Sequence, residues 1–122
     1  MKQITEDYCS FEIAQLLKEK GFDVPVQRVY SNKGEINETY CDYSDQYKYY
    51  DWLYPCASQS LALKWLREEQ NLYIEIRRNL NTFYYGFKVE QGMSEKVIFD
   101  YKYDSYEKAV EAALKYTLEN LI

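Results

Sequence analysis

Histidine is absent from this sequence of 122 residues, and glycine, proline and cysteine are scarce, with four, two and three residues. Histidine is the side chain that ordinarily titrates between pH 5 and 8, and it is the usual general base and the commonest metal ligand. The four glycines form neither a Gly-rich phosphate loop nor a Gly-x-Ser-x-Gly nucleophile turn. We therefore expect a protein that is not an enzyme and that uses no cofactor and no metal.

Long apolar runs are also missing. No uncharged apolar stretch approaches the roughly 18 residues of a membrane-spanning helix. The first nine residues carry Lys2, Glu6 and Asp7 without an apolar core, so they do not resemble a signal peptide. These absences predict a cytoplasmic protein without a membrane partner.

The three cysteines are Cys9, Cys41 and Cys56, and their spacing matches no Cys-x-x-Cys zinc pattern. An odd number leaves one thiol over after any pairing, so we expect reduced and independent thiols. Cys56 lies just before a predicted helix, and the positive end of a helix dipole favours a thiolate. The simpler interpretation is a small buried side chain, since free cysteine is commonly buried.

The composition is that of a folded domain, with 47% hydrophobic, 18% aromatic and 29% charged residues. The length fits one domain over residues 1–122. Periodicity predicts an α+β fold in the order α-β-β-α-β-β-β-α, in which an antiparallel sheet has its helices packed on one face. The predicted helices are 10–21, 58–69 and 104–121, and the predicted strands are 24–30, 39–43, 72–77, 83–89 and 97–103.

Several residues predict where these elements begin and end. Ser10 and Ser58 are typical N-caps, and the last helix begins at Asp104 or Ser105. Gly21 followed by Phe22 indicates a Schellman ending for the first helix. Pro25 has no N–H to donate, so we expect strand 24–30 to lie at a sheet edge.

Three blocks of sequence are familiar in combination: SFEIA with LKEKGFD in residues 10–23, YP with SQSLA and KWLRE in 54–68, and SYE with AVEAA in 105–113. Together they resemble a family of small, uncharacterised proteins encoded by phages, prophages and mobile elements of gut Bacteroidales. The blocks consist mainly of helix caps and core positions, and no activity of that family supplies a functional residue. Relatives often have histidines near the positions of Gln70 and Tyr73, so a function that rests on those imidazoles is absent here.

The net charge of −5 is unevenly distributed, because residues 35–51 hold five acids against the single base Lys48 and so contribute −4. Such a stretch disfavours duplex DNA and anionic membranes, since phosphate binding requires clustered Lys and Arg. The five acids are Glu35, Glu38, Asp42, Asp45 and Asp51.

Aromatic residues are concentrated in the same region, where residues 40–54 contain six tyrosines and a tryptophan. Tyrosine offers a large contact area, few rotatable bonds and a hydroxyl group, and it is enriched at protein interfaces. We therefore predict an accessory protein that binds another protein through this acidic, tyrosine-rich segment. The alternative is that the rings form a lid over the sheet. The candidate binding residues are Tyr43, Asp45, Tyr47, Tyr49, Tyr50, Asp51 and Trp52.

A second hypothesis uses the open face of the sheet. The order α-β-β-β-α after residue 58 is also that of a double-stranded RNA-binding domain, and Tyr73 and Tyr84 are placed to stack on bases. Acids such as Glu75 and Asp100 interrupt the basic residues, so we expect any nucleic-acid binding to be weak. A weak RNA- or single-strand-binding module is therefore the first alternative. A structural domain without a dedicated site is the second. The basic residues concerned are Lys64, Arg67, Arg77, Arg78, Lys88 and Lys102.

Overall fold

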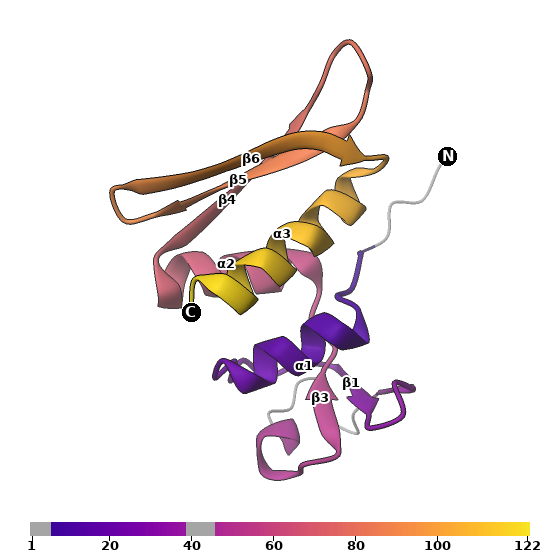
Figure 1. Cartoon of the computed structure of the whole chain (residues 1–122). Coiled ribbons are helices and arrows are strands. Elements are labelled where there is room, and N and C mark those ends of the chain that lie inside the picture. Colours follow the sequence, from indigo (N-terminus) through magenta and orange to yellow (C-terminus); the bar gives the residue numbers. More distant parts are fainter. Residues whose placement is uncertain (1–5, 39–45) are drawn as a thin grey trace. The chain divides into compact units, whose positions relative to one another are not determined.

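The computed structural model describes residues 6–38 and 46–122 (Figure 1). The chain divides into two compact units, Met1–Leu61 and Ala62–Ile122. Helices and antiparallel strands follow one another along both units, so the predicted α+β class is confirmed. The first unit contains α1 (Phe11–Glu19), β1 (Arg28–Ser31), β2 (Ile36–Glu38), the 3₁₀ helix η1 (Gln46–Tyr49) and β3 (Leu53–Pro55). Helix α2 (Gln59–Gln70) begins in the first unit, and β4 (Leu72–Arg78), β5 (Tyr85–Gln91), β6 (Ser94–Tyr103) and α3 (Tyr106–Asn120) follow in the second.

The helices begin at the predicted serines. A serine oxygen at the N-cap accepts a hydrogen bond from a backbone N–H that has no partner inside the helix. For the last helix the cap is Ser105, and the neighbouring Asp104 instead forms an ion pair with Lys108. The hydroxyl oxygens of Ser10, Ser58 and Ser105 accept from the N–H groups of Ile13, Leu61 and Lys108 at 3.3, 3.1 and 3.2 Å.

Helix α1 ends in the predicted Schellman motif. The N–H of Phe22 donates to the carbonyl oxygen of Leu17 at 2.9 Å, and the N–H of Gly21 donates to that of Lys18 at 3.2 Å. This arrangement requires a left-handed backbone at the residue after the cap. Gly21 meets that requirement with φ of +92°, where a side chain would be strained.

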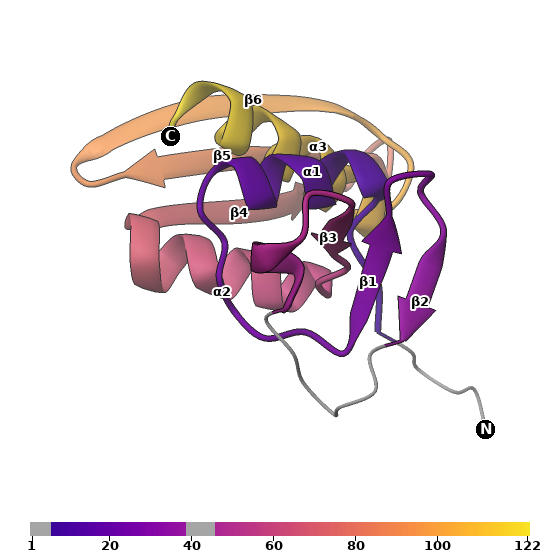
Figure 2. The ribbon, with the colours of Figure 1, turned by 90° about the horizontal axis from the view of Figure 1, so that it is seen from below.

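The first unit contains a three-stranded antiparallel sheet in the order β2-β1-β3. In Figure 2, β1 and β2 run side by side, and Tyr30 pairs with Ile36 of β2 and with Tyr54 of β3. The expected edge position of β1 is wrong, because β1 is the central strand. Pro25 lies before the strand begins, so its missing N–H costs no hydrogen bond of the ladder. The strand predicted over 39–43 lies outside the described residues.

The second unit contains the predicted antiparallel meander, in the order β4-β5-β6. The part of α2 that belongs to this unit and α3 lie on the same face of the sheet (Figures 1 and 2). Phe87 and Val89 of β5 are buried, as is Trp65 of α2. Helix α3 buries one stripe of side chains, which consists of Ala109, Val110, Ala113, Leu114, Thr117 and Leu118.

The pairing of β5 with β6 is irregular at Gly86. Tyr85 pairs with Tyr103 and Phe87 pairs with Ile98, so several residues of β6 stand opposite a single residue of β5. A Cβ atom on Gly86 would lie 3.1 Å from the Cα of Phe99 and 3.1 Å from the backbone nitrogen of Tyr101. A side chain at this position would force the facing backbone to shift by a few tenths of an ångström, so the close approach of the two backbones favours glycine. The irregularity bends β6 away from a regular ladder.

Candidate protein interface

The tyrosine-rich segment is described from Gln46 onward, so the predicted contacts Tyr43 and Asp45 lie outside the described residues. From there the chain forms η1, turns through residues 50–52 and enters β3. The 3₁₀ helix and the turn do not follow the alternating pattern of a strand, so rings that are close in sequence point in different directions. Each of the remaining candidates therefore has its own environment.

Tyr47 lies in the core of the first unit and has no exposed surface. Its ring stacks on Phe22 with a centroid distance of 6.3 Å and an interplanar angle of 27°. Its hydroxyl donates to the carbonyl oxygen of Val24 at 2.8 Å and contacts that of Phe22 at 3.3 Å. A buried ring with a satisfied hydroxyl contributes to folding and offers nothing to a partner. The candidate surface therefore leaves Tyr47 out.

The structure brings the other candidates together on the surface. We call residues 49–52 the aromatic turn, because Tyr49, Tyr50 and Trp52 are 72%, 42% and 54% exposed and Asp51 is exposed between them. The rings of Tyr50 and Trp52 contact each other at a centroid distance of 5.0 Å. Exposed aromatic residues in a group are typical of contact surfaces, whereas single ones are ordinary.

Lys18 of α1 holds the backbone of the aromatic turn. Its ammonium group donates to the carbonyl oxygens of Tyr50 at 2.6 Å and of Leu53 at 2.7 Å. The same group lies 4.9 Å from the centroid of the Tyr54 ring. Inside the turn, the N–H of Leu53 donates to the carbonyl oxygen of Tyr50 at 3.3 Å. The exposed rings therefore stand on a backbone that is fixed at both ends.

Partial burial of Lys18 lowers the pKa of its ammonium group, and the nearby carboxylate of Asp51 opposes that shift. A lowered pKa is expected for a cation that has lost part of its hydration. Two carbonyl oxygens and a ring face replace that water. Sequence reasoning missed this residue, because nothing near Lys18 in the sequence indicates which distant carbonyl groups it will reach.

A second exposed group lies in the second unit, in residues 79–84 between β4 and β5, which we call the hairpin loop. Leu80, Phe83 and Tyr84 are 78%, 58% and 47% exposed there. The side-chain oxygen of Asn79 accepts from the N–H groups of Asn81 at 2.8 Å and Thr82 at 3.3 Å. This turn ends β4, and β5 begins only at Tyr85. Phe83 and Tyr84 are therefore not in the strand that was predicted over 83–89. The signal was available in Asn79, because an Asn side chain often replaces backbone hydrogen bonds in turns.

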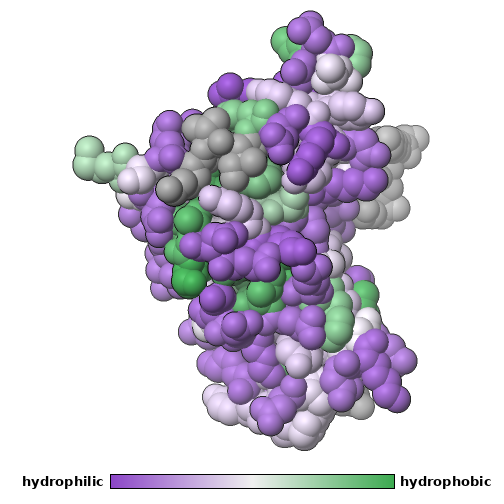
Figure 3. All heavy atoms as spheres, in the orientation of Figure 1, coloured by the Kyte–Doolittle hydropathy of each residue, from purple (hydrophilic) through white to green (hydrophobic). Residues whose placement is uncertain are grey.

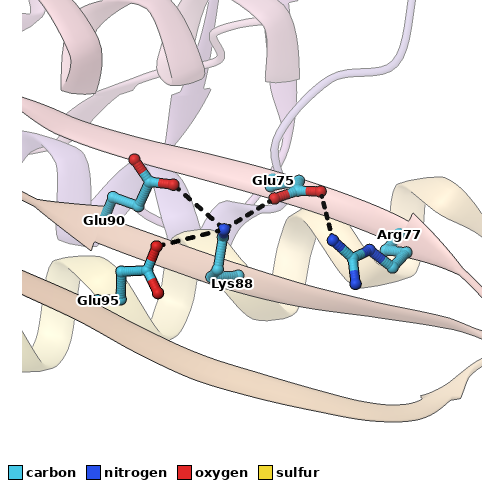
Figure 4. Close-up of polar contacts among 5 residues, drawn as sticks. All are labelled: Glu75, Arg77, Lys88, Glu90 and Glu95. Atoms are coloured by element: carbon cyan, nitrogen blue, oxygen red, sulfur yellow. Dashed lines mark hydrogen bonds and ion pairs between the residues drawn. The ribbon is translucent and has the colours of Figure 1, made fainter.

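The outer face of the second sheet carries a network of charges around Lys88 (Figure 4). The ammonium group of Lys88 lies 3.2 Å from Glu75, 3.2 Å from Glu90 and 3.6 Å from Glu95. Glu75 also forms an ion pair with Arg77 at 3.1 Å. The guanidinium group of Arg77 in turn lies 4.5 Å from the centroid of the Phe99 ring.

This network shifts the titration of its members. Hydrogen bonds to Glu75 and Glu90 raise the pKa of Lys88, and hydrogen bonds from Lys88 and Arg77 lower the pKa of Glu75. Each shift favours the charged form, as opposite charges in contact do. Three carboxylates face the two cations within this network, so the network itself offers no surplus positive charge to a phosphate backbone. These five residues are thus poorly suited to contact phosphates.

Both described cysteines, Cys9 and Cys56, are buried. Burial raises the pKa of the Cys56 thiol, and a hydrogen bond with Tyr30 and the charge of Arg28 only partly offset this effect. The environment therefore opposes a thiolate, and the buried-side-chain interpretation of Cys56 fits better. Cys56 also lines a hollow of about 260 Å³ beside Tyr8 and Arg28, whose guanidinium carbon lies 4.5 Å from the Tyr8 ring centroid.

On the face shown in Figure 3, hydrophilic residues predominate and apolar residues gather in separate patches. Over residues 6–38 and 46–122, no group of three or more side chains is arranged to hold a metal ion. Within the same residues, no helix is long and apolar enough to cross a membrane. Comparison of the chain with models of protein families, with curated proteins and with solved structures found no match.

Proposed function

We propose that this chain is a non-enzymatic accessory protein of a phage or mobile element, and that it binds another protein through the aromatic turn. The observation that carries the proposal is the exposure of Tyr49, Tyr50 and Trp52 on a backbone that Lys18 holds in place. A binding surface that is already ordered loses less entropy on association than a flexible one. Fixed aromatic side chains are also the residues that most often dominate binding energy.

The chemistry of the aromatic turn favours a partner with exposed cations. Asp51 attracts positive charge, and the faces of tyrosine and tryptophan rings bind Arg and Lys groups. Lys48 already lies 5.8 Å from the centroid of the Tyr49 ring, which is the same kind of contact within the chain. We place this binding in the cytoplasm, because three cysteines without a Cys-x-x-Cys pattern suit a reducing compartment better than a disulfide framework.

The experiment is capture of partners from a host lysate by the tagged protein, with proteins identified by mass spectrometry. The test variant replaces Tyr49, Tyr50 and Trp52 by serine and leaves the buried Tyr47 intact. The matched control replaces three exposed side chains of the second unit by serine: Tyr73, Leu80 and Tyr84. Thermal melts of all three proteins accompany the capture.

We expect the test variant to melt within a few degrees of the parent and to lose a partner that the control still captures. Surface substitutions usually change stability by no more than about 0.5 kcal/mol, whereas interface aromatics contribute about 2 kcal/mol or more to binding. Equal capture by the parent and both variants would contradict the proposal. A large drop in the melting temperature of the test variant would do so too, because the rings would then be a lid over the core.

A further inference from the structure

The sheet of the second unit has two edges of different character. β4 forms one edge, and within the described residues it pairs only with β5, in regular register over its whole length. β6 forms the other edge and is irregular opposite Gly86. An edge strand presents N–H and C=O groups that can pair with a strand of another chain, and a bulge hinders such pairing. β4 is therefore the edge that is suited to accept a further strand.

The side chains of β4 alternate between the two faces of the sheet. Leu72 is buried and Ile74 and Ile76 are partly buried, whereas the alternate residues Tyr73, Glu75 and Arg77 are exposed on the outer face. Two of these outer residues, Glu75 and Arg77, carry opposite charges and lie two positions apart on the same face. Their side chains are 44% and 53% exposed, so each retains surface for a second partner. The outer face of β4 thus carries one acid and one base at alternate positions of the strand.

We propose that β4 pairs antiparallel with β4 of a second copy of this chain, centred on Ile76, so that Glu75 of each copy faces Arg77 of the other. In a two-fold antiparallel pair, residues at equal distances before and after the centre stand directly opposite each other. Opposite charges in such positions attract and like charges repel. The centre at Ile76 therefore creates two equivalent attractive pairs from one strand.

Other registers are less favourable on the same grounds. A centre at Glu75 or at Arg77 places that residue against its own copy, with like charges opposed. A shift by one residue would bring the inner isoleucines of one copy to the outer face of the other. The proposed register instead keeps both helix layers on one side and joins two three-stranded sheets into six strands, a common sheet size. This surface shares no residue with the aromatic turn, so the inference goes beyond the proposed function.

The test measures self-association by sedimentation velocity at micromolar to submillimolar concentrations of the full chain. Glu75→Arg and Arg77→Glu each place like charges opposite each other in the proposed register. We expect each variant alone to associate at least about tenfold more weakly than the parent. An equimolar mixture of the two variants restores both attractive pairs, so it should form a dimer with one copy of each. The double variant with both substitutions should also regain self-association.

Recovery in the mixture separates pairing from folding. A variant that fails to fold cannot be rescued by the other variant, and thermal melts of each protein check this point. The proposal is overturned if the parent is monomeric across the concentration range. It is equally overturned if the single variants associate as the parent does, which would mean that a different surface forms the dimer. Loss of association in the single variants without recovery in the mixture also contradicts the register.

Discussion

The ammonium nitrogen of Lys18 lies 2.6 Å from the carbonyl oxygen of Tyr50, a residue 32 positions further along the chain. This contact joins α1 to the aromatic turn, in which the N–H of Leu53 also donates to the carbonyl oxygen of Tyr50. A charged donor forms stronger hydrogen bonds than a neutral one. The fixed position of the exposed rings therefore depends on Lys18, a cation that lies outside the aromatic segment.

Replacing Lys18 by methionine should loosen the aromatic turn while leaving the fold intact. Methionine keeps much of the apolar stem but cannot donate to the two carbonyl oxygens, so the local opening free energy should fall by about 1–2 kcal/mol. Amide hydrogen exchange, read by mass spectrometry on peptides covering residues 48–55, should become roughly tenfold faster or more. Lys64→Met on the exposed side of α2 is the control and should leave these peptides unchanged. Unchanged exchange in Lys18→Met would show that the turn is held by other contacts.

Tyr47 and Tyr49 belong to the same turn of η1, yet they should respond oppositely to mutation. Tyr47→Phe removes the hydrogen bond to Val24 and should cost about 0.5–1.5 kcal/mol, and Tyr47→Ser also empties the ring site and should cost about 3–5 kcal/mol. Tyr49→Ser should stay within about 0.5 kcal/mol of the parent, because its ring is mostly exposed. Urea denaturation measures all three. A stable Tyr47→Ser protein would place that ring at the surface.

This contrast marks how far the sequence could predict the site. Tyr47 and Tyr49 have similar neighbours in sequence, and composition alone assigned both to the binding surface. Burial of Tyr47 depends on the carbonyl groups of Phe22 and Val24, more than twenty residues away, which no local pattern indicates. The composition of residues 40–54 could indicate that some aromatic rings are exposed. It could not indicate that the exposed rings are those of Tyr49, Tyr50 and Trp52.

Local elements were predicted better than their pairing. The Schellman ending at Gly21 and the serine caps depend on a few neighbouring residues, so the sequence indicated them directly. The strand Leu53–Pro55 is short and ends in proline, and it exists because it pairs with β1 on the side away from β2. The division of the strands into two sheets depends on such long-range pairing, which periodicity does not encode.

The ion pairs of Glu75 should make stability depend on pH in acid. Lys88 and Arg77 lower the pKa of Glu75 below its ordinary value of 4.5, so their stabilising effect is fully present above pH 4.5 and is lost as the pH falls through the pKa of the folded state. The melting temperature of Glu75→Gln should therefore lie below that of the parent at pH 7, and the difference should shrink towards zero near pH 2, and also in high salt at pH 7. Both proteins are melted at a concentration at which the parent is monomeric. Glu68→Gln, on the exposed side of α2, is the matched control for replacing a carboxylate by an amide. A difference between Glu75→Gln and the parent that stayed the same from pH 7 to pH 2 would mean that Glu75 acts through packing rather than through its charge.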